Sequence, residues 1–279
     1  MNSVTRFIFE DLDIHGALVQ LSDTWQSMQQ LRGYTPPVAA LLGEMAAVAA
    51  LIGSNLKTPG RLTFQAQGSG DVSLLVVDCN EQLHLRGMAR GKAIDVAAPL
   101  NELLGEGRLL LSLQNAADSN PYQSYVPLSG DSIAEIFEHY LGQSEQQPAR
   151  LWLGADNHHA VGLFLQTLPA TARESQDADG WNRIQHLAAT VRTGELLLPP
   201  GVLLKRLFPE ETIRLFEPRP VRYHCPRDEI KVRNLLVSLG REELESILAE
   251  QGEIVIRDDI CNHEYRFDAD ILYLFNRLH

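Results

Sequence analysis

Two cysteines near the C-terminal end, Cys225 and Cys261, are the residues of this sequence best suited to metal or redox chemistry. Arg227 follows the first by two positions, and Asp258 precedes the second by three. Cysteines at all four positions would form the pattern Cys-x-Cys…Cys-x-x-Cys of a four-thiolate zinc site. Arginine has no lone pair to offer a metal, and aspartate offers oxygen instead of sulfur. The spacing therefore predicts a metal-based site that has been altered or lost.

The third cysteine and the other polar motifs carry weaker signals. Cys79 follows an alternating stretch, residues 72–78, so we expect a buried structural thiol. The Gly68-x-Gly70 pair lacks the third glycine and the following helix of a dinucleotide-binding loop, and it fits a hairpin turn. Residues 156–159, Asp-Asn-His-His, fit a surface turn better than a metal site. We find no pairing of nucleophile and base in the sequence, which predicts a protein that is not an enzyme.

The composition predicts a soluble globular protein with an acidic surface. Of the 279 residues, 44% are hydrophobic and 22% charged, and the formal net charge is −12. Nucleic acid and anionic membranes are poor partners for such a surface, because they are bound by clustered Lys and Arg. We expect no signal peptide, and residues 38–53, interrupted by Glu44, look too short and too polar to span a bilayer. Three cysteines do not make a secreted disulfide framework, so we expect a cytoplasmic protein.

Hydrophobic periodicity predicts strands and helices in mixed order. Strand-like stretches occupy residues 5–21, 61–67, 72–78, 82–86, 109–114, 150–154 and 160–168. Helical stretches occupy residues 24–30, 38–56, 131–143 and 181–191, followed by a Leu-rich stretch, 195–208, that Pro199-Pro200 interrupts. The strands cluster without regular alternation with helices. The expected fold is therefore α+β, with a mixed β-sheet and packed helices in the N-terminal part.

Two composition breaks divide the chain into three expected parts. Residues 173–180 are polar and acidic, and Glu217-Pro218-Arg219-Pro220 is a rigid extended joint. We therefore expect an α+β body at 1–172, a helical linker region at 173–220, and a small C-terminal lobe at 221–279. A lobe of that size has a marginal apolar core and commonly needs a metal or a disulfide.

A series of short motifs resembles the heat shock protein 33 family, the redox-regulated 33 kDa chaperonins. No single motif is specific, but their order and spacing are, and the likeness covers nearly the whole chain. The matching segments are residues 40–44, 60–63, 67–68, 85–90, 121–123, 126–128, 143–146, 206–208, 216–218, 238–240 and 254–267.

The resemblance implies a holdase chaperone that works without ATP. Members of that family hold zinc through four C-terminal cysteines when reduced. Oxidation forms disulfides, releases the zinc and unfolds the small lobe and the linker, and the exposed apolar surface then captures unfolding client proteins, often with dimerisation. By this resemblance we expect unfolded proteins as partners, a possible homodimer, and a client surface on the middle helices and the strand face that they cover.

The zinc pattern of the family is incomplete in this chain. Cys225 and Cys261 match the first and fourth family cysteines, and Arg227 and Asp258 stand at the second and third positions. We therefore expect no cofactor, zinc included. A retained zinc would have to use the two cysteines with Asp258 or His263. His224 adds little, because neighbouring residues of a strand point to opposite faces.

The resemblance also suggests what replaces the metal. If the lobe keeps the shape of the family, Cys225 and Cys261 face each other and can form a disulfide, and Arg227 and Asp258 face each other as an ion pair. A disulfide closing a loop of about 36 residues contributes about 4 kcal/mol in the chain-entropy model, so oxidation would tighten the lobe. The alternative is that both cysteines are inert and both charged residues solvated, and the sequence leaves this open.

The sequence thus predicts a holdase whose four-cysteine zinc switch is lost or altered. Such a protein would protect other proteins against stress-induced aggregation through exposed apolar surface, without a catalytic residue. The alternative is a scaffold of the same fold that binds one specific partner and is not a chaperone. Suppressing the aggregation of several unrelated proteins would distinguish the chaperone from the scaffold.

Overall fold

The computed structural model describes residues 1–56, 59–92, 98–115, 121–128, 130–144, 146–169, 177 and 179–277. The chain forms two compact units, Met1–His224 and Cys225–His279. The first unit extends past the expected boundary at residue 172 and includes the described part of the linker region. Most of 173–180, where we expected that boundary, lies outside the described residues.

The first sheet of the large unit is built around an N-terminal hairpin. Its strand order is β10 (Ile213–Leu215), β1 (Asn2–Phe9), β2 (Ile14–Leu21), β9 (Ala160–Thr167) and β8 (Ala149–Ala155), with β11 (Arg219–Pro220) also paired to β1. The single extended stretch expected at residues 5–21 is thus two strands. Bends at residues 10–13 separate them, and seven residue pairs from Asn2↔Leu21 to Ile8↔His15 join them.

The second sheet contains the hairpin predicted around Gly68. Its order is β12 (Arg222–Tyr223), β5 (His84–Gly91), β4 (Val72–Asn80), β3 (Gly60–Gly68), β6 (Gly107–Asn115) and β7 (Tyr122–Pro127). The β3 and β4 strands pair from Arg61↔Asn80 to Gln67↔Leu74, which confirms the hairpin and its turn. The β12 strand pairs in parallel with β5 through only two residues.

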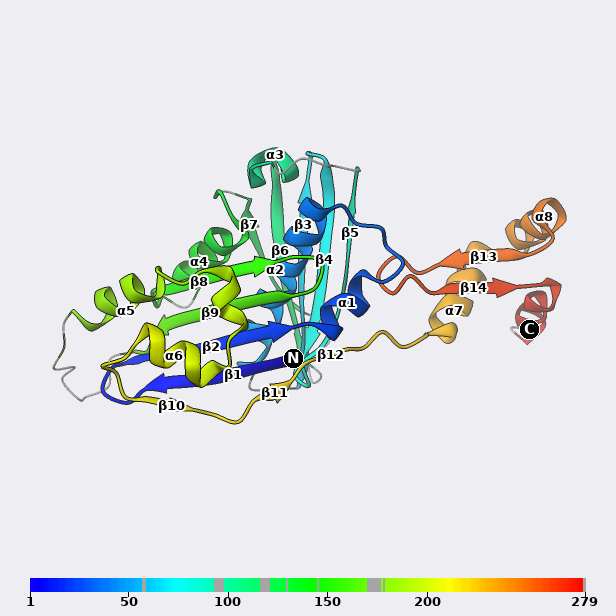
Figure 1. The fold of residues 1–279 in the computed structure, drawn as a ribbon. Helices are drawn as coiled ribbons and strands as arrows, with labels where there is room; N and C mark the ends of the chain where they lie inside the picture. The colour runs from blue at the N-terminus through cyan, green and yellow to red at the C-terminus, as the bar shows by residue number, and fades with distance from the viewer. Residues whose placement is uncertain are drawn as a thin grey trace. The chain divides into compact units, whose positions relative to one another are not determined.

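The α2 helix (Pro36–Gly53) packs against both sheets and forms the centre of the core (Figure 1). Glycines allow its close approach. A Cβ on Gly43 would lie 2.5 Å from the Ala155 Cβ, and one on Gly53 would lie 2.7 Å from the Cys79 Sγ. By length and composition alone α2 could cross a membrane, contrary to our expectation, but 72% of it is buried inside the protein. Its apolar composition is therefore explained by a position between two sheets.

Burial of Glu44 on α2 predicts a pH-dependent stability. Burial raises the pKa of its carboxyl from 4.5 to about 7. A raised folded-state pKa contributes stability that is complete below the unfolded pKa and is lost as pH rises through the folded one, here between pH 4.5 and about 7. We expect Glu44→Gln to flatten this dependence. We expect this variant to gain about 1 kcal/mol in free energy of unfolding at pH 8, because the partly buried amide still costs free energy.

Urea unfolding at pH 5.5 and pH 8, followed by tryptophan fluorescence, measures this effect. The matched control is Glu102→Gln, which removes an exposed carboxylate from α3 (Leu100–Leu104). It should keep the pH dependence of the wild-type protein. Equal pH dependence in the wild-type and Glu44→Gln proteins would contradict the assignment.

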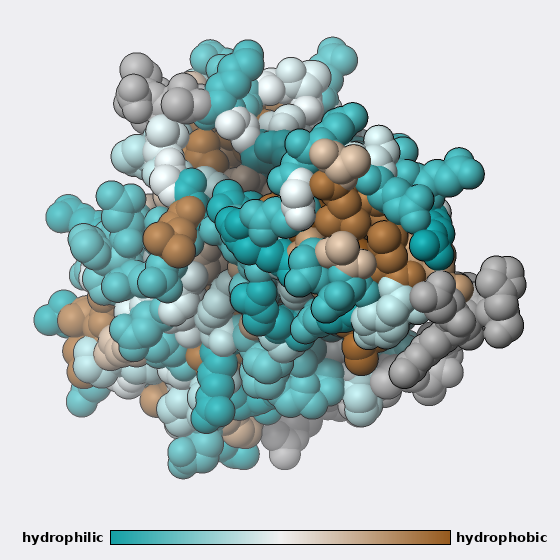
Figure 2. All heavy atoms as spheres, turned by 90° about the vertical axis from the view of Figure 1, so that its right-hand side faces the viewer, coloured by the Kyte–Doolittle hydropathy of each residue, from teal (hydrophilic) through white to brown (hydrophobic). Residues whose placement is uncertain are grey.

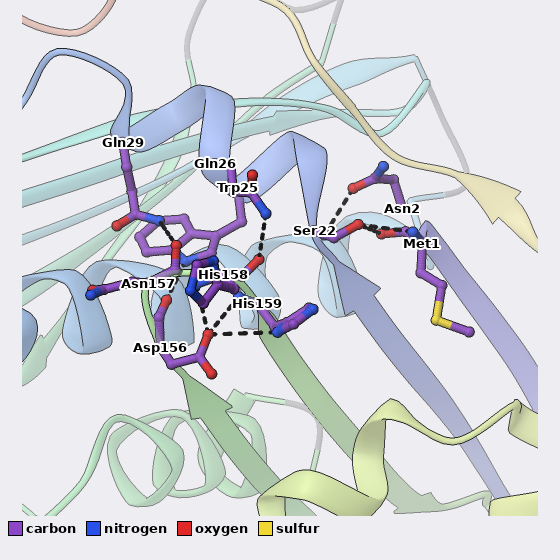
Figure 3. A network of polar contacts seen from close by, with 10 residues as sticks. All are labelled: Met1, Asn2, Ser22, Trp25, Gln26, Gln29, Asp156, Asn157, His158 and His159. Atoms are coloured by element: carbon purple, nitrogen blue, oxygen red, sulfur yellow. Dashed lines mark hydrogen bonds and ion pairs between the residues drawn. The ribbon is translucent and has the colours of Figure 1, made fainter.

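Hydrogen bonds join the α1 helix (Asp23–Gln29) to the turn between β8 and β9 (Figure 3). Asp156 Oδ1 accepts the backbone N–H groups of His158 and His159, both at 2.7 Å. Three α1 side chains donate to backbone carbonyls of this turn: Trp25 to Asp156 at 2.7 Å, and Gln26 to His158 and Gln29 to Asn157 at 3.2 Å. The Asp-Asn-His-His motif is therefore a structural turn, as expected.

Further helices cover the sheets of the large unit. The α4 helix (Ile133–Ser144) packs on β8 and on α2. The middle of the chain forms α5 (Gly180–Ala188), η1 (Thr193–Leu197) and α6 (Pro200–Leu207), which lie on the first sheet (Figure 1). Pro199 precedes α6 and Pro200 begins it, so these prolines separate two helical segments.

The small unit has a modest core of its own. Its elements are α7 (Glu229–Leu239), α8 (Arg241–Gln251), β13 (Ile254–Arg257), β14 (Glu264–Phe267) and η2 (Ala269–Arg277). Among the residues that the structure describes here, six buried apolar side chains form the core: Leu236, Leu244, Ile254, Tyr265, Phe267 and Ile271. Large apolar side chains of α7 stay uncovered, with Ile230 74% and Leu235 52% exposed. Figure 2 shows apolar side chains in patches among hydrophilic ones.

Candidate functional site

The structure brings the two C-terminal cysteines together. Cys225 is the first residue of the small unit, and Cys261 lies in the turn between β13 and β14. Their Cα atoms are 5.6 Å apart and their sulfurs are joined in a disulfide, across 36 residues of sequence. Natural disulfides have Cα separations of about 4.4–6.8 Å. Cys261 is only 5% exposed, so one end of the bond is buried.

Asp258 stabilises the turn that carries Cys261. Its Oδ1 accepts the backbone N–H groups of Ile260 at 2.8 Å and of Cys261 at 3.1 Å, and its carbonyl accepts the N–H of Asn262 at 2.7 Å. Aspartate side chains commonly bond backbone groups two and three residues further along. The carboxylate at the third family position therefore orients the cysteine loop.

The Arg227 side chain has a different set of contacts from the one expected. It donates to the backbone carbonyl of Glu264, and its guanidinium carbon lies 4.7 Å from the ring centroid of Tyr265. The ion pair expected between Arg227 and Asp258 is not formed among the described residues, because Asp258 is used by its own turn. Arg227 instead attaches the chain after Cys225 to β14.

The side chains around the disulfide do not fit a zinc ion. A closed zinc site takes four ligands, usually thiolate or imidazole, and a disulfide sulfur is no longer a thiolate. Within the described ranges, no group of three or more His, Cys, Asp or Glu lies close enough to hold a metal.

The two histidines next to the cysteines lie in different surroundings. His263 has a buried Nδ1 without a hydrogen-bond partner among the described residues. His224 belongs to the large unit, where its ring centroid lies 4.5 Å from that of His84.

The remaining cysteine is a buried thiol in the large unit, as predicted. Cys79 is fully buried and free. Burial raises the pKa of its thiol to about 12, although the Arg219 charge opposes the rise. Thiolate is the reactive form of cysteine, so Cys79 is inert at neutral pH.

The middle helices cover an apolar face of the first sheet. The Phe9 ring on β1 packs edge-on against Phe208, which follows α6, with centroids 5.2 Å apart. Strand and helix side chains form one buried cluster here: Phe7, Phe9, Ile14, Leu18, Val161, Leu163, Leu165, Ile184, Ala188, Leu196, Leu203, Leu204, Leu207 and Phe208. Removing α5, η1 and α6 would expose this face to solvent.

Sequence reasoning missed the role of the segment that follows these helices. Residues 213–221, here called the strap, run along β1 through β10 and β11. Arg219 anchors the strap, because its Nη1 donates to the Ser54 carbonyl at 2.8 Å and its Nη2 to the Glu81 carbonyl at 2.5 Å. The prolines around Arg219 indicated extended backbone, but nothing local indicated which groups this arginine would bind.

Comparison with known proteins gives this arrangement its context. A family model described as "Hsp33 protein" matches residues 2–268. The "33 kDa chaperonin" of Nitrosococcus oceani is 42% identical over 98% of this chain and 94% of its own length. The "33 kDa chaperonin" of Pseudomonas aeruginosa is 41% identical over 97% of this chain and 93% of its own length.

A solved structure supports the fold. This chain matches the crystal structure of the 33 kDa chaperonin (heat shock protein 33 homolog) from Thermotoga maritima with a TM-score of 0.84. The match covers 100% of this chain and 99% of that chain, at 21% sequence identity. At 21% identity the match shows the fold alone, and it confirms the α+β class. On the sequence matches, the chain belongs to the Hsp33 family of non-enzymatic holdase chaperones.

Proposed function

We propose that this protein is a cytoplasmic holdase that binds unfolding proteins without ATP and keeps them from aggregating. Family membership supports this most strongly. The apolar sheet face under α5, η1 and α6 is a suitable client surface, because it is large, contiguous and covered by short helices. Exposed contiguous apolar area is what a binder of unfolded proteins needs.

The regulation proposed here differs from a four-cysteine zinc switch. A disulfide between Cys225 and Cys261 restrains the unfolded lobe by closing a loop of 36 residues. The cytosol keeps most thiols reduced, so the bond would form under oxidative stress. Oxidation would then stabilise the lobe, and heat would provide the main trigger for client binding. A homodimer in the active state is part of this proposal by family likeness.

Light scattering from several unrelated, thermally unfolding enzymes tests the chaperone function. We expect aggregation to be suppressed for all of them at heat-shock temperature, and treating the protein with peroxide beforehand should add no benefit. The matched cysteine variants are Cys225→Ser and, as a control in the other unit, Cys79→Ala. A peroxide-dependent gain that is lost in Cys225→Ser would contradict the proposed regulation. Suppression for one partner alone would favour the scaffold.

A further inference from the structure

The strap occupies the outer edge of β1 with an incomplete set of strand pairs. It forms three residue pairs at Phe9↔Ile213, Ile8↔Arg214 and Phe7↔Leu215, and two more at Val4↔Arg219 and Ser3↔Pro220. On its other edge β1 forms seven pairs with β2. The strap therefore does not use the full pairing capacity of this edge.

The gap is a shift in register: between Phe7↔Leu215 and Val4↔Arg219 the strap has three residues, 216–218, where β1 has two, 5 and 6. Pro218 and Pro220 have no backbone N–H, so they cannot donate to a neighbouring strand. Phe216 still donates its N–H to the Arg6 carbonyl at 2.9 Å, and further along the strap Val221 donates to the Asn2 carbonyl at 2.9 Å. A chain with backbone N–H groups at positions 218 and 220 could keep the register of the first three pairs and form a continuous ladder along β1.

The strap is also held by few buried side chains. Leu215 is 42% and Phe216 39% exposed, whereas Val221 is 1% exposed. The ion pair between Arg214 and Glu10 is exposed at the surface, where such pairs contribute little. Segments with little buried apolar contact open at a small fraction of the global unfolding free energy. Arg219 and Val221 are therefore the main restraints.

We propose that the strap side of β1 is a docking site for an extended segment of a client protein, which replaces the strap by adding a strand to the first sheet. This proposal rests on the holdase function proposed above and specifies how part of the client is bound. Backbone N–H and C=O groups are the same in every sequence, so strand addition can serve many unrelated clients. The strap would then protect an edge that otherwise attracts other chains.

The geometry also defines the preferred client segment. β1 spans Asn2–Phe9, so a segment of about eight residues would match it. The segment should contain no proline at the positions that donate to β1. Alternate β-branched or aromatic side chains would pack beside Phe7 and Phe9, because paired residues of neighbouring strands share a face.

An engineered disulfide that locks the strap in place gives the first test. Ile8 and Arg214 are paired, and the Cα atoms of paired residues lie about 4.5–5.5 Å apart, within reach of a disulfide. We expect oxidised Ile8→Cys/Arg214→Cys to lose at least fivefold in aggregation suppression and to regain it on reduction. The matched lock is Arg61→Cys/Gln114→Cys, a paired and exposed position of β3 and β6. It should keep wild-type suppression when oxidised.

A peptide experiment then separates strand addition from plain apolar binding. The probe is a fluorescent peptide copying residues 212–221 with Pro218→Val and Pro220→Val. Its partner is the same peptide N-methylated at the Phe216 amide and at every second amide on either side. Both have the same side chains, but only the first can pair with β1. At heat-shock temperature we expect at least tenfold tighter binding of the unmodified peptide, measured by fluorescence anisotropy.

The outcomes are distinct. Full suppression by the oxidised Ile8→Cys/Arg214→Cys protein, or equal affinity for the two peptides, would overturn the docking site and leave the holdase function standing. Absence of suppression by the wild-type protein would overturn the holdase function itself. Loss of suppression in the strap lock alone, together with preference for the unmodified peptide, would support the site.

Discussion

Replacing Cys225 with serine is expected to lower the free energy of unfolding of the C-terminal lobe by about 4 kcal/mol under oxidising conditions. The disulfide with Cys261 closes a loop of 36 residues, and its removal returns that freedom to the unfolded lobe. A lobe of this length, Cys225–His279, has a total stability of about 3–8 kcal/mol. The loss is therefore comparable with the whole stability of the lobe.

Hydrogen exchange of peptides from α7 and α8 measures this change without interference from the large unit. We expect exchange to be up to about a thousandfold faster, since each 1.4 kcal/mol is worth a factor of ten. Reduction of the wild-type protein should have the same effect. The control Cys79→Ala removes the thiol of the large unit and should leave exchange in the lobe unchanged. Equal protection with and without the bond would show that packing alone holds the lobe.

Replacing Arg219 with alanine is expected to free the strap from β1. The guanidinium donates to two backbone carbonyls, those of Ser54 and Glu81. Hydrogen bonds from a charged donor contribute about 1.5–3 kcal/mol each, and the vacated carbonyls lose a partner. We expect the opening free energy of the strap to fall by about 3 kcal/mol, so that the open form is about a hundredfold more populated.

Two measurements follow from this change. Exchange of the strap amides should be about a hundredfold faster, and client aggregation should be suppressed at a temperature where the wild-type protein is inactive. The matched control is Arg214→Ala on the same strap, which breaks only the exposed pair with Glu10. This variant should lower the opening free energy of the strap by less than about 1 kcal/mol. Similar exchange in the two arginine variants would show that Arg219 does not anchor the strap.

Much of the fold follows from local patterns. The hairpin of β3 and β4 was predictable because alternation at residues 61–67 and 72–78 flanks a glycine-rich turn. The buried α2 helix was predictable because apolar residues lie on most of its sides. The boundary between β1 and β2 was missed, because apolar alternation on both sides hid the bends at residues 10–13.

The candidate site shows the limit of residue spacing. Spacing and family likeness singled out Cys225 and Cys261, and the structure joins them. The same reasoning paired Arg227 with Asp258, where the structure gives each another partner. Position on a family pattern indicates which backbone segments are neighbours. Several donors can compete for one side chain, and the nearest ones in the chain have an advantage. The Asp258 carboxylate accepts backbone N–H groups of its own turn, which are held near it by the chain itself.

The sequence by itself determined the α+β class of fold and the presence of only two of the four family cysteines, because these depend on residue types and short-range periodicity. It predicted three parts of the chain, and the structure has two units. The tertiary structure alone decided that the strap pairs with β1 and that Arg219 binds the carbonyls of Ser54 and Glu81. Those contacts join residues more than a hundred positions apart. No local pattern encodes them, since a short, proline-containing segment finds its partner only after the sheet that offers the edge has formed.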